Sequence, residues 1–126
     1  MSRTYVSKSG GDIAGFYALS TGGISHEEAA DRLKKGVPRH AIPVIILTRM
    51  GVDLREQGKG LGAGLLTDAC RRVAAMSEDI GIRALLIHAK NEDAKSFYMN
   101  FAEFEESPTD RNHLSLLIKD LRLTIN

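Results

Sequence analysis

Cysteine is nearly absent from this chain, because Cys70 is the only one among its 126 residues. A single thiol excludes an internal disulfide framework and is typical of a protein that works in a reducing cytoplasm. Free cysteine usually behaves as a small apolar residue. We therefore expect Cys70 to be a buried part of the core rather than a reactive thiol.

Long apolar segments are missing too. The chain begins Met1-Ser2-Arg3-Thr4-Tyr5, without the apolar region of a secretory signal. No stretch approaches the roughly 20 apolar residues that cross a bilayer. We therefore expect a soluble, cytoplasmic protein without a membrane partner. Hydrophobic residues make up 43% of the chain, enough for one core, which predicts a single domain over residues 1–126.

The chain also lacks an excess of either charge, since its net charge is +1. This value neither requires nor excludes a nucleic-acid partner, so the placement of the basic residues matters more. They gather in two places, at Arg71 and Arg72 and in the segment that carries Arg32, Lys34, Lys35, Arg39 and His40. Charged runs of this kind are usually solvated helix faces, which is the interpretation that the residues alone favour.

Metal-binding patterns are lacking among the histidines and the cysteine. The four histidines include no H-x-x-x-H spacing and no pairing with cysteine. Zinc sites in proteins are built from such spacings. We therefore expect no metal site.

What the chain does contain is a glycine-rich segment, Gln57-Gly58-Lys59-Gly60-Leu61-Gly62-Ala63. It follows an apolar, β-branched run over 42–48, which predicts a buried strand ending near Asp53, and it leads into an amphipathic helix. Glycine lets backbone N–H groups approach an anion closely, and the first helical turn adds unpaired donors and the positive end of the helix dipole. The segment therefore predicts a phosphate-binding turn.

Three kinds of phosphate ligand use glycines in this setting. A P-loop requires G-x-x-x-x-G-K-[ST], and the only Gly-Lys pair here is followed by Gly60, which disfavours a nucleotide triphosphatase. Gly58, Gly60 and Ala63 match the dinucleotide pattern G-x-G-x-x-[GA] only loosely, since the strand over 83–88 ends without the expected carboxylate. The third ligand is coenzyme A.

The remaining patterns predict the element order β-β-α-β-α-β-α-β. Ser25 to Glu28 form a capping box, Gly81 closes the helix after the glycine turn, and Asn91 caps the next helix. Two strands joined by a helix predict parallel neighbours with a right-handed crossover. The predicted strands are 3–8, 13–20, 42–53, 83–88 and 113–119, and the helices are 25–35, 61–80 and one that starts after Asn91.

At this point the chain resembles the GNAT acyltransferases. Their pyrophosphate signature, [QR]-x-x-G-x-[GA], is matched by Gln57 to Gly62, and their later helix carries a Phe-Tyr pair that Phe97-Tyr98 matches. The segments 84–89, 107–110 and 114–121 resemble the acetyltransferase toxins of bacterial toxin-antitoxin pairs, which acetylate the amino group of aminoacyl-tRNA. The resemblance extends from Arg3 over nearly the whole chain.

The resemblance implies a fold, a cosubstrate and a set of site residues. The fold is α/β (α+β), a mixed, mostly antiparallel sheet with helices on both faces and a central parallel pair splayed at the acetyl-CoA site. The catalytic residues are Tyr98, which donates a proton to the departing thiolate, and Val52, whose N–H polarises the thioester carbonyl. The residues implied to bind acetyl-CoA are Met50, Gly51, Val52, Gln57, Gly58, Lys59, Gly60, Leu61, Gly62, Ala63 and Asn91.

Several of these residues have plain structural alternatives. Gly51 fits a simple β-bulge, Asn91 fits an ordinary helix cap, and Tyr98 belongs to an aromatic group that fits the core. The family resemblance also makes the basic residues of one cluster candidates for contacts with tRNA phosphates, and these are Arg32, Lys34, Lys35 and Arg39.

No residue stands out as a general base. An α-amino group, with a pKa of about 7.7 to 8.0, is already partly neutral near physiological pH, unlike a lysine side chain at about 10.4. Direct attack with water as the proton acceptor therefore fits an aminoacyl-tRNA substrate. His88 and His113 are alternatives as proton relays, although packed or surface roles are more common for lone histidines on strands.

Two departures from the family keep other functions open. The family has a first strand and two helices before the segment that Arg3 begins, so we expect a chain shortened at its N-terminus. The exposed sheet edge would favour a homodimer or a captured partner. The family's Phe-Gly-Phe is replaced by Phe101-Ala102-Glu103-Phe104. The alternatives are an inactive remnant that binds coenzyme A or an antitoxin, and an enzyme that acetylates a protein or a small amine.

Overall fold

The N-terminal part of the chain forms an antiparallel hairpin of β1 (Ser2–Ser9) and β2 (Asp12–Ile24). Gly10 and Gly11 make its turn with φ angles of 60° and 90°, which residues with a side chain rarely adopt. This confirms the predicted hairpin. The computed structural model describes residues 2–25, 27–34 and 42–125.

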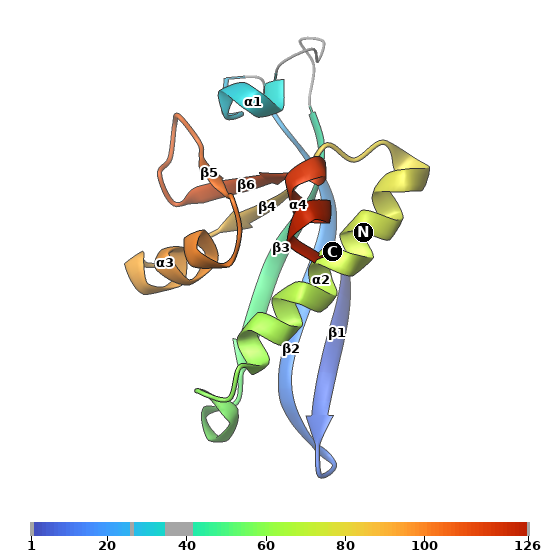
Figure 1. Cartoon of the computed structure of the whole chain (residues 1–126), viewed down its shortest axis with the longest axis vertical. Coiled ribbons are helices and arrows are strands. Elements are labelled where there is room, and N and C mark those ends of the chain that lie inside the picture. Colours follow the sequence, from blue (N-terminus) through green and yellow to red (C-terminus); the bar gives the residue numbers. More distant parts are fainter. Residues whose placement is uncertain (1, 26, 35–41, 126) are drawn as a thin grey trace.

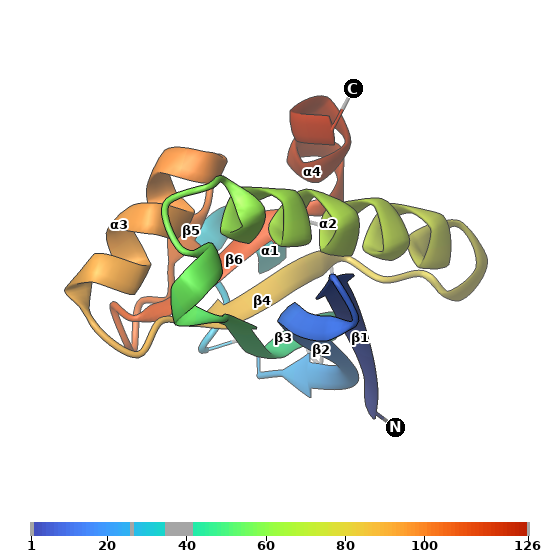
Figure 2. The same ribbon diagram turned by 90° about the horizontal axis from the view of Figure 1, so that it is seen from below.

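The hairpin is one side of a six-stranded sheet of order β1-β2-β3-β4-β6-β5 (Figures 1 and 2). The strand β3 (Ile42–Val52) pairs antiparallel with β2 and parallel with β4 (Ala84–His88). The helix α2 (Leu61–Ile80) connects this parallel pair. The predicted fold class, a mostly antiparallel sheet with a central parallel pair, is confirmed.

The remaining elements complete the other side of the sheet. The helix α3 (Glu92–Phe101) follows β4, and β5 (Glu105–Glu106) and β6 (His113–Leu117) pair with each other. The strand β6 also pairs antiparallel with β4, and α4 (Ile118–Ile125) ends the chain.

The sheet buries apolar side chains on both faces. On one face α2, α3 and α4 cover the larger cluster, which includes Leu66, Cys70, Ile87 and Tyr98. On the other face Leu33, from the short helix α1 (Asp31–Lys34), packs with a smaller cluster. Cys70 is fully buried, and this burial raises the pKa of its thiol to about 12. Its expected core role is confirmed.

The predicted start of the first helix and the predicted end of the last strand were wrong. The Ser25 hydroxyl accepts from the Glu28 N–H at 3.3 Å, as in a capping box, and donates to the Glu28 carboxylate at 2.8 Å, but the helix starts only at Asp31. The last strand ends at Leu117 because Ile118 starts α4, whose apolar side packs on α2. The short strand β5 and the 3-10 helix η1 (Leu54–Glu56) were not predicted. No helix in the described ranges is long and apolar enough to cross a bilayer.

Candidate active site

The parallel pair β3 and β4 separates at a β-bulge. Parallel pairing ends at Leu47 and Ile87, whereas β3 continues to Val52. At the same point the β2–β3 register shifts, because Ala18 pairs with Arg49 and the next residue of β2 pairs with Leu47. The extra residue is Thr48, whose hydroxyl donates to the Ala18 carbonyl at 3.3 Å. A bulge bends its strand, so β3 turns away from β4 and opens a cleft.

The bulge corrects one sequence interpretation. Gly51, for which a β-bulge was the plain alternative, pairs in regular register with Phe16. A Cβ atom at Gly51 would lie 2.7 Å from Cε1 of Phe16. The absence of a side chain at this position therefore lets the Phe16 ring pack against the backbone of β3 beside the cleft.

The cleft between the separated strands has a volume of about 300 Å³. Met50 from β3 and Tyr98 from α3, both predicted site residues, line it together. The sequence interpretation missed most of the other lining residues, because nothing in their local pattern marks the strands as separating. The missed residues are Phe16, Leu47, Thr48, Arg49, Ile87, Lys90 and Ala94, and the remaining lining residue is His88, which the sequence analysis named as an alternative proton relay.

The backbone of β3 presents unpaired groups to this cleft. The N–H of Asp53 donates to the Ala14 carbonyl at 2.8 Å. In an antiparallel ladder, the N–H groups of successive residues point alternately toward the partner strand and away from it. Because the N–H of Asp53 points toward β2, the N–H of Val52 points away from β2. It points to the side from which β4 has separated. This is the geometry that a backbone donor to a ligand in the cleft requires.

The glycine turn lies directly after β3 and leads into α2. Gly58 and Gly60 both have φ of 81°, and Gly60 is the N-cap of α2. No side chain in the described part of the protein caps this helix, and its first turn holds no acidic residue. The first N–H groups of α2 are therefore available to an anion, as the sequence predicted.

A hydrogen bond holds this turn against the end of β3. Gln57, the first residue of the signature, donates from Nε2 to the Val52 carbonyl at 3.2 Å. A Cβ at Gly62 would lie 3.9 Å from Cγ2 of Val52 and 3.6 Å from Cζ of Phe97. The end of β3, the start of α2 and the middle of α3 therefore meet at one place. Lys59, in contrast, points to Glu56 at 3.5 Å, and both lie on the surface turn.

Tyr98 lies between the cleft and the core. Its side chain is 9% exposed, and burial raises the pKa of its phenol above 10.0. The rings of Phe97 and Phe104 lie 5.4 and 6.2 Å from its ring. A buried phenol that keeps its proton near neutral pH, and that lines a cleft, can act as a proton donor.

Asn91 caps α3, since its side-chain oxygen accepts from the N–H of Ala94 at 2.8 Å. This contact bears out the helix-cap interpretation, and an acetyl-CoA contact by its amide stays a prediction. One turn further along α3, Lys95 is buried and forms an ion pair of 2.6 Å with Glu106 on β5. This pair ties the helix that carries Tyr98 to the sheet.

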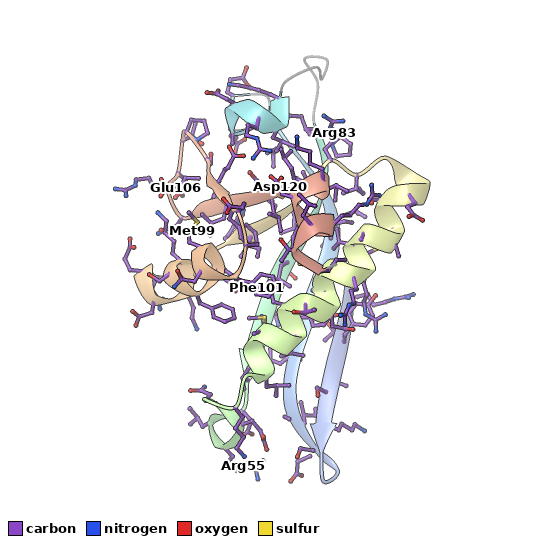
Figure 3. All side chains as sticks on the ribbon, in the orientation of Figure 1. Arg55, Arg83, Met99, Phe101, Glu106 and Asp120 are labelled. Carbon is purple, nitrogen blue, oxygen red and sulfur yellow. The ribbon has the colours of Figure 1, made fainter. Side chains whose placement is uncertain are left out.

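Arg32 and Lys34, the described residues of the basic cluster, belong to α1, which lies at the end of the sheet opposite the glycine turn (Figure 1). Arg32 forms ion pairs with Glu105 at 3.0 Å and Asp120 at 2.9 Å, and Lys34 pairs with Asp31 at 3.5 Å. Figure 3 shows Asp120 well away from Arg55, which lies beside the turn.

The other two predicted tRNA contacts, Lys35 and Arg39, lie outside the described residues. The tRNA role of all four basic residues stays a prediction. Across the described ranges, no three His, Cys, Asp or Glu side chains gather in a way that could hold a metal ion.

No protein-family model matches the chain. The chain is 46% identical over 124 residues to a tRNA-acetylating toxin of Mycobacterium tuberculosis, a match that covers 98% of this chain and 74% of the relative. It superposes on AtaT complexed with acetyl-methionyl-tRNAfMet with a TM-score of 0.87 at 26% identity, covering 99% of this chain and 76% of that one.

A third similar structure is a mutant AtaT toxin bound to the C-terminus of the antitoxin AtaR and acetyl-CoA. Its TM-score is 0.72 at 28% identity, with 89% of this chain and 63% of that chain covered. The fold and the toxin resemblance that the sequence predicted are both confirmed by these matches.

Proposed function

Because the chain belongs to the GNAT-type tRNA-acetylating toxins, we propose that it transfers the acetyl group of acetyl-CoA to the α-amino group of aminoacyl-tRNA and so blocks translation. The observation that carries this proposal is the cleft where β3 and β4 separate. There the unpaired backbone of β3 and the phenol of Tyr98 line one space, beside a helix start without a side-chain cap.

Each part of the cleft matches a part of acetyl-CoA. The N–H groups after Gly60, from Leu61 to Ala63, bind the pyrophosphate, and the Gln57 contact with Val52 holds the turn in place. The pantetheine arm lies along the backbone of Met50, Gly51 and Val52 like an added strand. Gly58, Lys59 and Gly62 complete the turn, and Asn91 borders the cleft at the start of α3.

The chemistry needs one hydrogen-bond donor and one acid. The N–H of Val52 stabilises the negative charge that develops on the thioester oxygen as the amine attacks. The Tyr98 phenol then donates its proton to the departing sulfur of coenzyme A. Burial of Tyr98 supports this role, because a phenol with a raised pKa stays protonated until the thiolate forms.

The same family membership supports an antitoxin partner and a cytoplasmic location. An AtaT structure holds the C-terminus of the antitoxin AtaR, and we propose an antitoxin partner here as well. The chain acts as one acetyltransferase domain over residues 1–126, in the cytoplasm, where aminoacyl-tRNA is found. Pairing of two copies through the open edge of β1 makes it a homodimer.

Transfer of labelled acetyl from acetyl-CoA to charged tRNAs tests the function. Label is expected on charged tRNA, with none on uncharged tRNA or free amino acids. Label on a protein N-terminus or a small amine alone would make the acceptor assignment wrong. No transfer, with acetyl-CoA binding intact by calorimetry, would show an inactive binder instead.

A further inference from the structure

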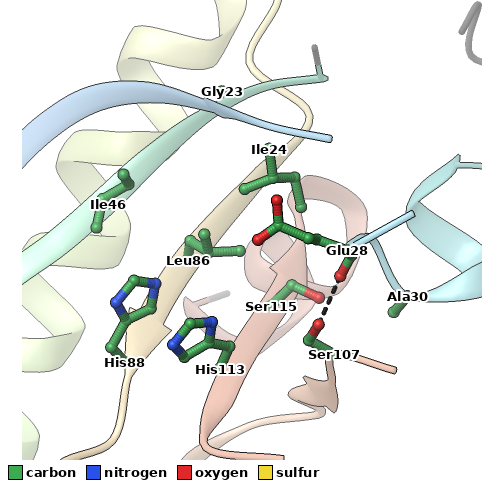
Figure 4. Close-up of a pocket in the computed structure, with 10 residues that line it drawn as sticks. All are labelled: Gly23, Ile24, Glu28, Ala30, Ile46, Leu86, His88, Ser107, His113 and Ser115. Atoms are coloured by element: carbon green, nitrogen blue, oxygen red, sulfur yellow. Dashed lines mark hydrogen bonds between the residues drawn. The ribbon is translucent and has the colours of Figure 1, made fainter. Parts of the chain in front are cut away.

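A second cavity, of about 160 Å³, lies on the face of the sheet opposite α2. Its floor is apolar, formed by Ile24, Ile46 and Leu86, as Figure 4 shows. Ile46 and Leu86 belong to the smaller apolar cluster of this face. The rim is polar and includes the paired imidazoles of His88 and His113.

His88 is common to this cavity and to the cleft that holds Met50 and Tyr98. It is the last residue of β4, directly after Ile87, the last residue of β4 paired with β3. The separation of the two strands therefore opens beside His88. The imidazole of His88 therefore lies between the second cavity and the cleft.

The two histidines form a stacked pair. They lie opposite each other on β4 and β6, with ring centroids 3.8 Å apart and planes 10° from parallel. Two protonated rings at this distance would repel each other, which disfavours a second proton on the pair. Asp110 supplies the ion-pair partner, with its carboxylate 3.3 Å from Nε2 of His113.

We propose that the second cavity receives the aminoacyl group of the acceptor, and that His88 accepts the proton that the α-amino group loses. This inference rests on the function proposed above. As the nitrogen bonds to the acetyl carbon, its proton moves to the free ring nitrogen of His88, while Tyr98 protonates the departing sulfur. His88 then releases its proton to water, Tyr98 regains one from water, and the amide and the thiol of coenzyme A leave.

The charges around His88 favour a neutral ring. Partial burial lowers the pKa of His88 below 6.5, and the electrostatic interaction with His113 lowers it further, whereas the carboxylates of Asp110 and Glu28 raise it. The other titratable groups that line the cleft with it are Arg49, Lys90 and Tyr98. A neutral imidazole near pH 7 is ready to accept a proton from the amine.

Two substitutions at His88 separate proton transfer from packing. His88→Phe keeps a ring to stack on His113 and removes the proton acceptor, so we expect kcat to fall about 100-fold with an unchanged Kd for acetyl-CoA. His88→Ala should lose similar activity and regain part of it with added imidazole, whereas His88→Phe should not respond. Wild-type kcat in His88→Phe would overturn the role of His88.

The pH profile gives a second readout. Replacing the imidazole of His113 in His113→Phe takes away one cause of the lowered pKa of His88. Because activity needs neutral His88, the acid limb of kcat, measured with saturating acceptor, should move to higher pH. An unmoved acid limb contradicts the proposal.

The failure of this inference and the failure of the proposed function can be told apart. A wild-type protein that acetylates no charged tRNA overturns both. An active wild-type protein whose His88 variants keep full activity overturns only the inference about His88.

The apolar floor makes a prediction about the acceptor. Ile24→Trp would fill part of this floor. It should reduce acetylation of tRNA charged with a large apolar amino acid by about 10-fold or more, which is the effect of blocking a side-chain site. Acetylation of glycyl-tRNA should be unchanged. Leu123→Trp, on an exposed part of α4, is the matched control. An unchanged ratio between the two acceptors in Ile24→Trp would show that the aminoacyl group binds elsewhere.

Discussion

Tyr98 is the single side chain on which the proposed chemistry most depends. Tyr98→Phe removes one oxygen from a residue that is 9% exposed and leaves its packing against Phe104 intact. Turnover should fall about 100-fold or more, because general acid catalysis contributes on that scale. Steady-state kinetics and calorimetry with acetyl-CoA measure turnover and binding separately.

The control for this change is Tyr5→Phe, on β1 and away from the cleft lining, which should keep wild-type turnover. Equal turnover in Tyr98→Phe and Tyr5→Phe would remove the phenol of Tyr98 from the mechanism. A large loss of acetyl-CoA affinity in Tyr98→Phe would point to a binding role instead.

Glu106 makes the stability of the protein depend on acid pH. Its hydrogen bond and ion pair with Lys95 hold the pKa of Glu106 below 4.5. A carboxyl with a depressed folded pKa stabilises the fold above its unfolded pKa, and this contribution disappears as pH falls through the folded value. The urea midpoint of Glu106→Gln should therefore lie below wild type at pH 7, and the difference should shrink below pH 4.5.

Glu103→Gln, at an exposed position after α3, is the matched control and should follow wild type at every pH. A difference between Glu106→Gln and wild type that stayed constant from pH 7 to pH 3 would show that the amide disturbs packing rather than an ion pair. Lys95 is buried, so the change leaves its ammonium without the Glu106 partner.

Among the structural elements, the glycine turn requires a special backbone at two positions. Gly60 has φ of 81° with open space around its Cβ position, so a substitution there is opposed by the backbone and not by a clash. Gly60→Val should move the N–H groups at the start of α2 and abolish acetyl-CoA binding, measured by calorimetry. Binding at wild-type affinity would contradict the assignment of this turn to the pyrophosphate.

Gly64, inside α2, is the matched control for Gly60→Val. It is exposed, has no atom within 4 Å of its Cβ position and has no positive φ. Gly64→Ala should keep acetyl-CoA binding and raise the free energy of unfolding by roughly 0.5–1 kcal/mol, since alanine is the better helix former.

The elements also differ in how well the sequence predicted them. The hairpin turn at Gly10 and Gly11, the start of α2 after Gly60 and the cap at Asn91 follow from local backbone requirements, and all were predicted correctly. The bulge at Thr48 was missed, because it depends on how β2 and β4 pair with β3. The helix α1 was predicted to start at Ser25 and starts only at Asp31, since a Ser25–Glu28 contact can also form outside a helix.

At the scale of the whole molecule, β1 lies at the edge of the sheet in the described part of the chain. Its outer N–H and C=O groups are a template for another strand, and Val6 on it is 53% exposed. Sedimentation should therefore give about twice the chain mass of 13.8 kDa. A monomer at tens of micromolar would make the homodimer wrong.

Val6→Lys tests whether the edge of β1 is the contact, because lysine on an edge strand discourages pairing. It should shift the mass toward the monomer, while Leu123→Lys, at an exposed position on α4, should not. If both variants stayed dimeric, the two copies would meet through another surface.

The sequence alone determined the glycine turn and the parallel pair around α2, and it singled out Tyr98, which lines the cleft. These follow from φ angles, hydrophobic period and a family motif, all of which are local in the chain. The tertiary structure alone decided the position of the bulge at which β3 leaves β4, the engagement of Arg32 with Glu105, 73 residues away, and the place of His88 between two cavities. Such features depend on which distant residues pack together, and no local pattern encodes those distances.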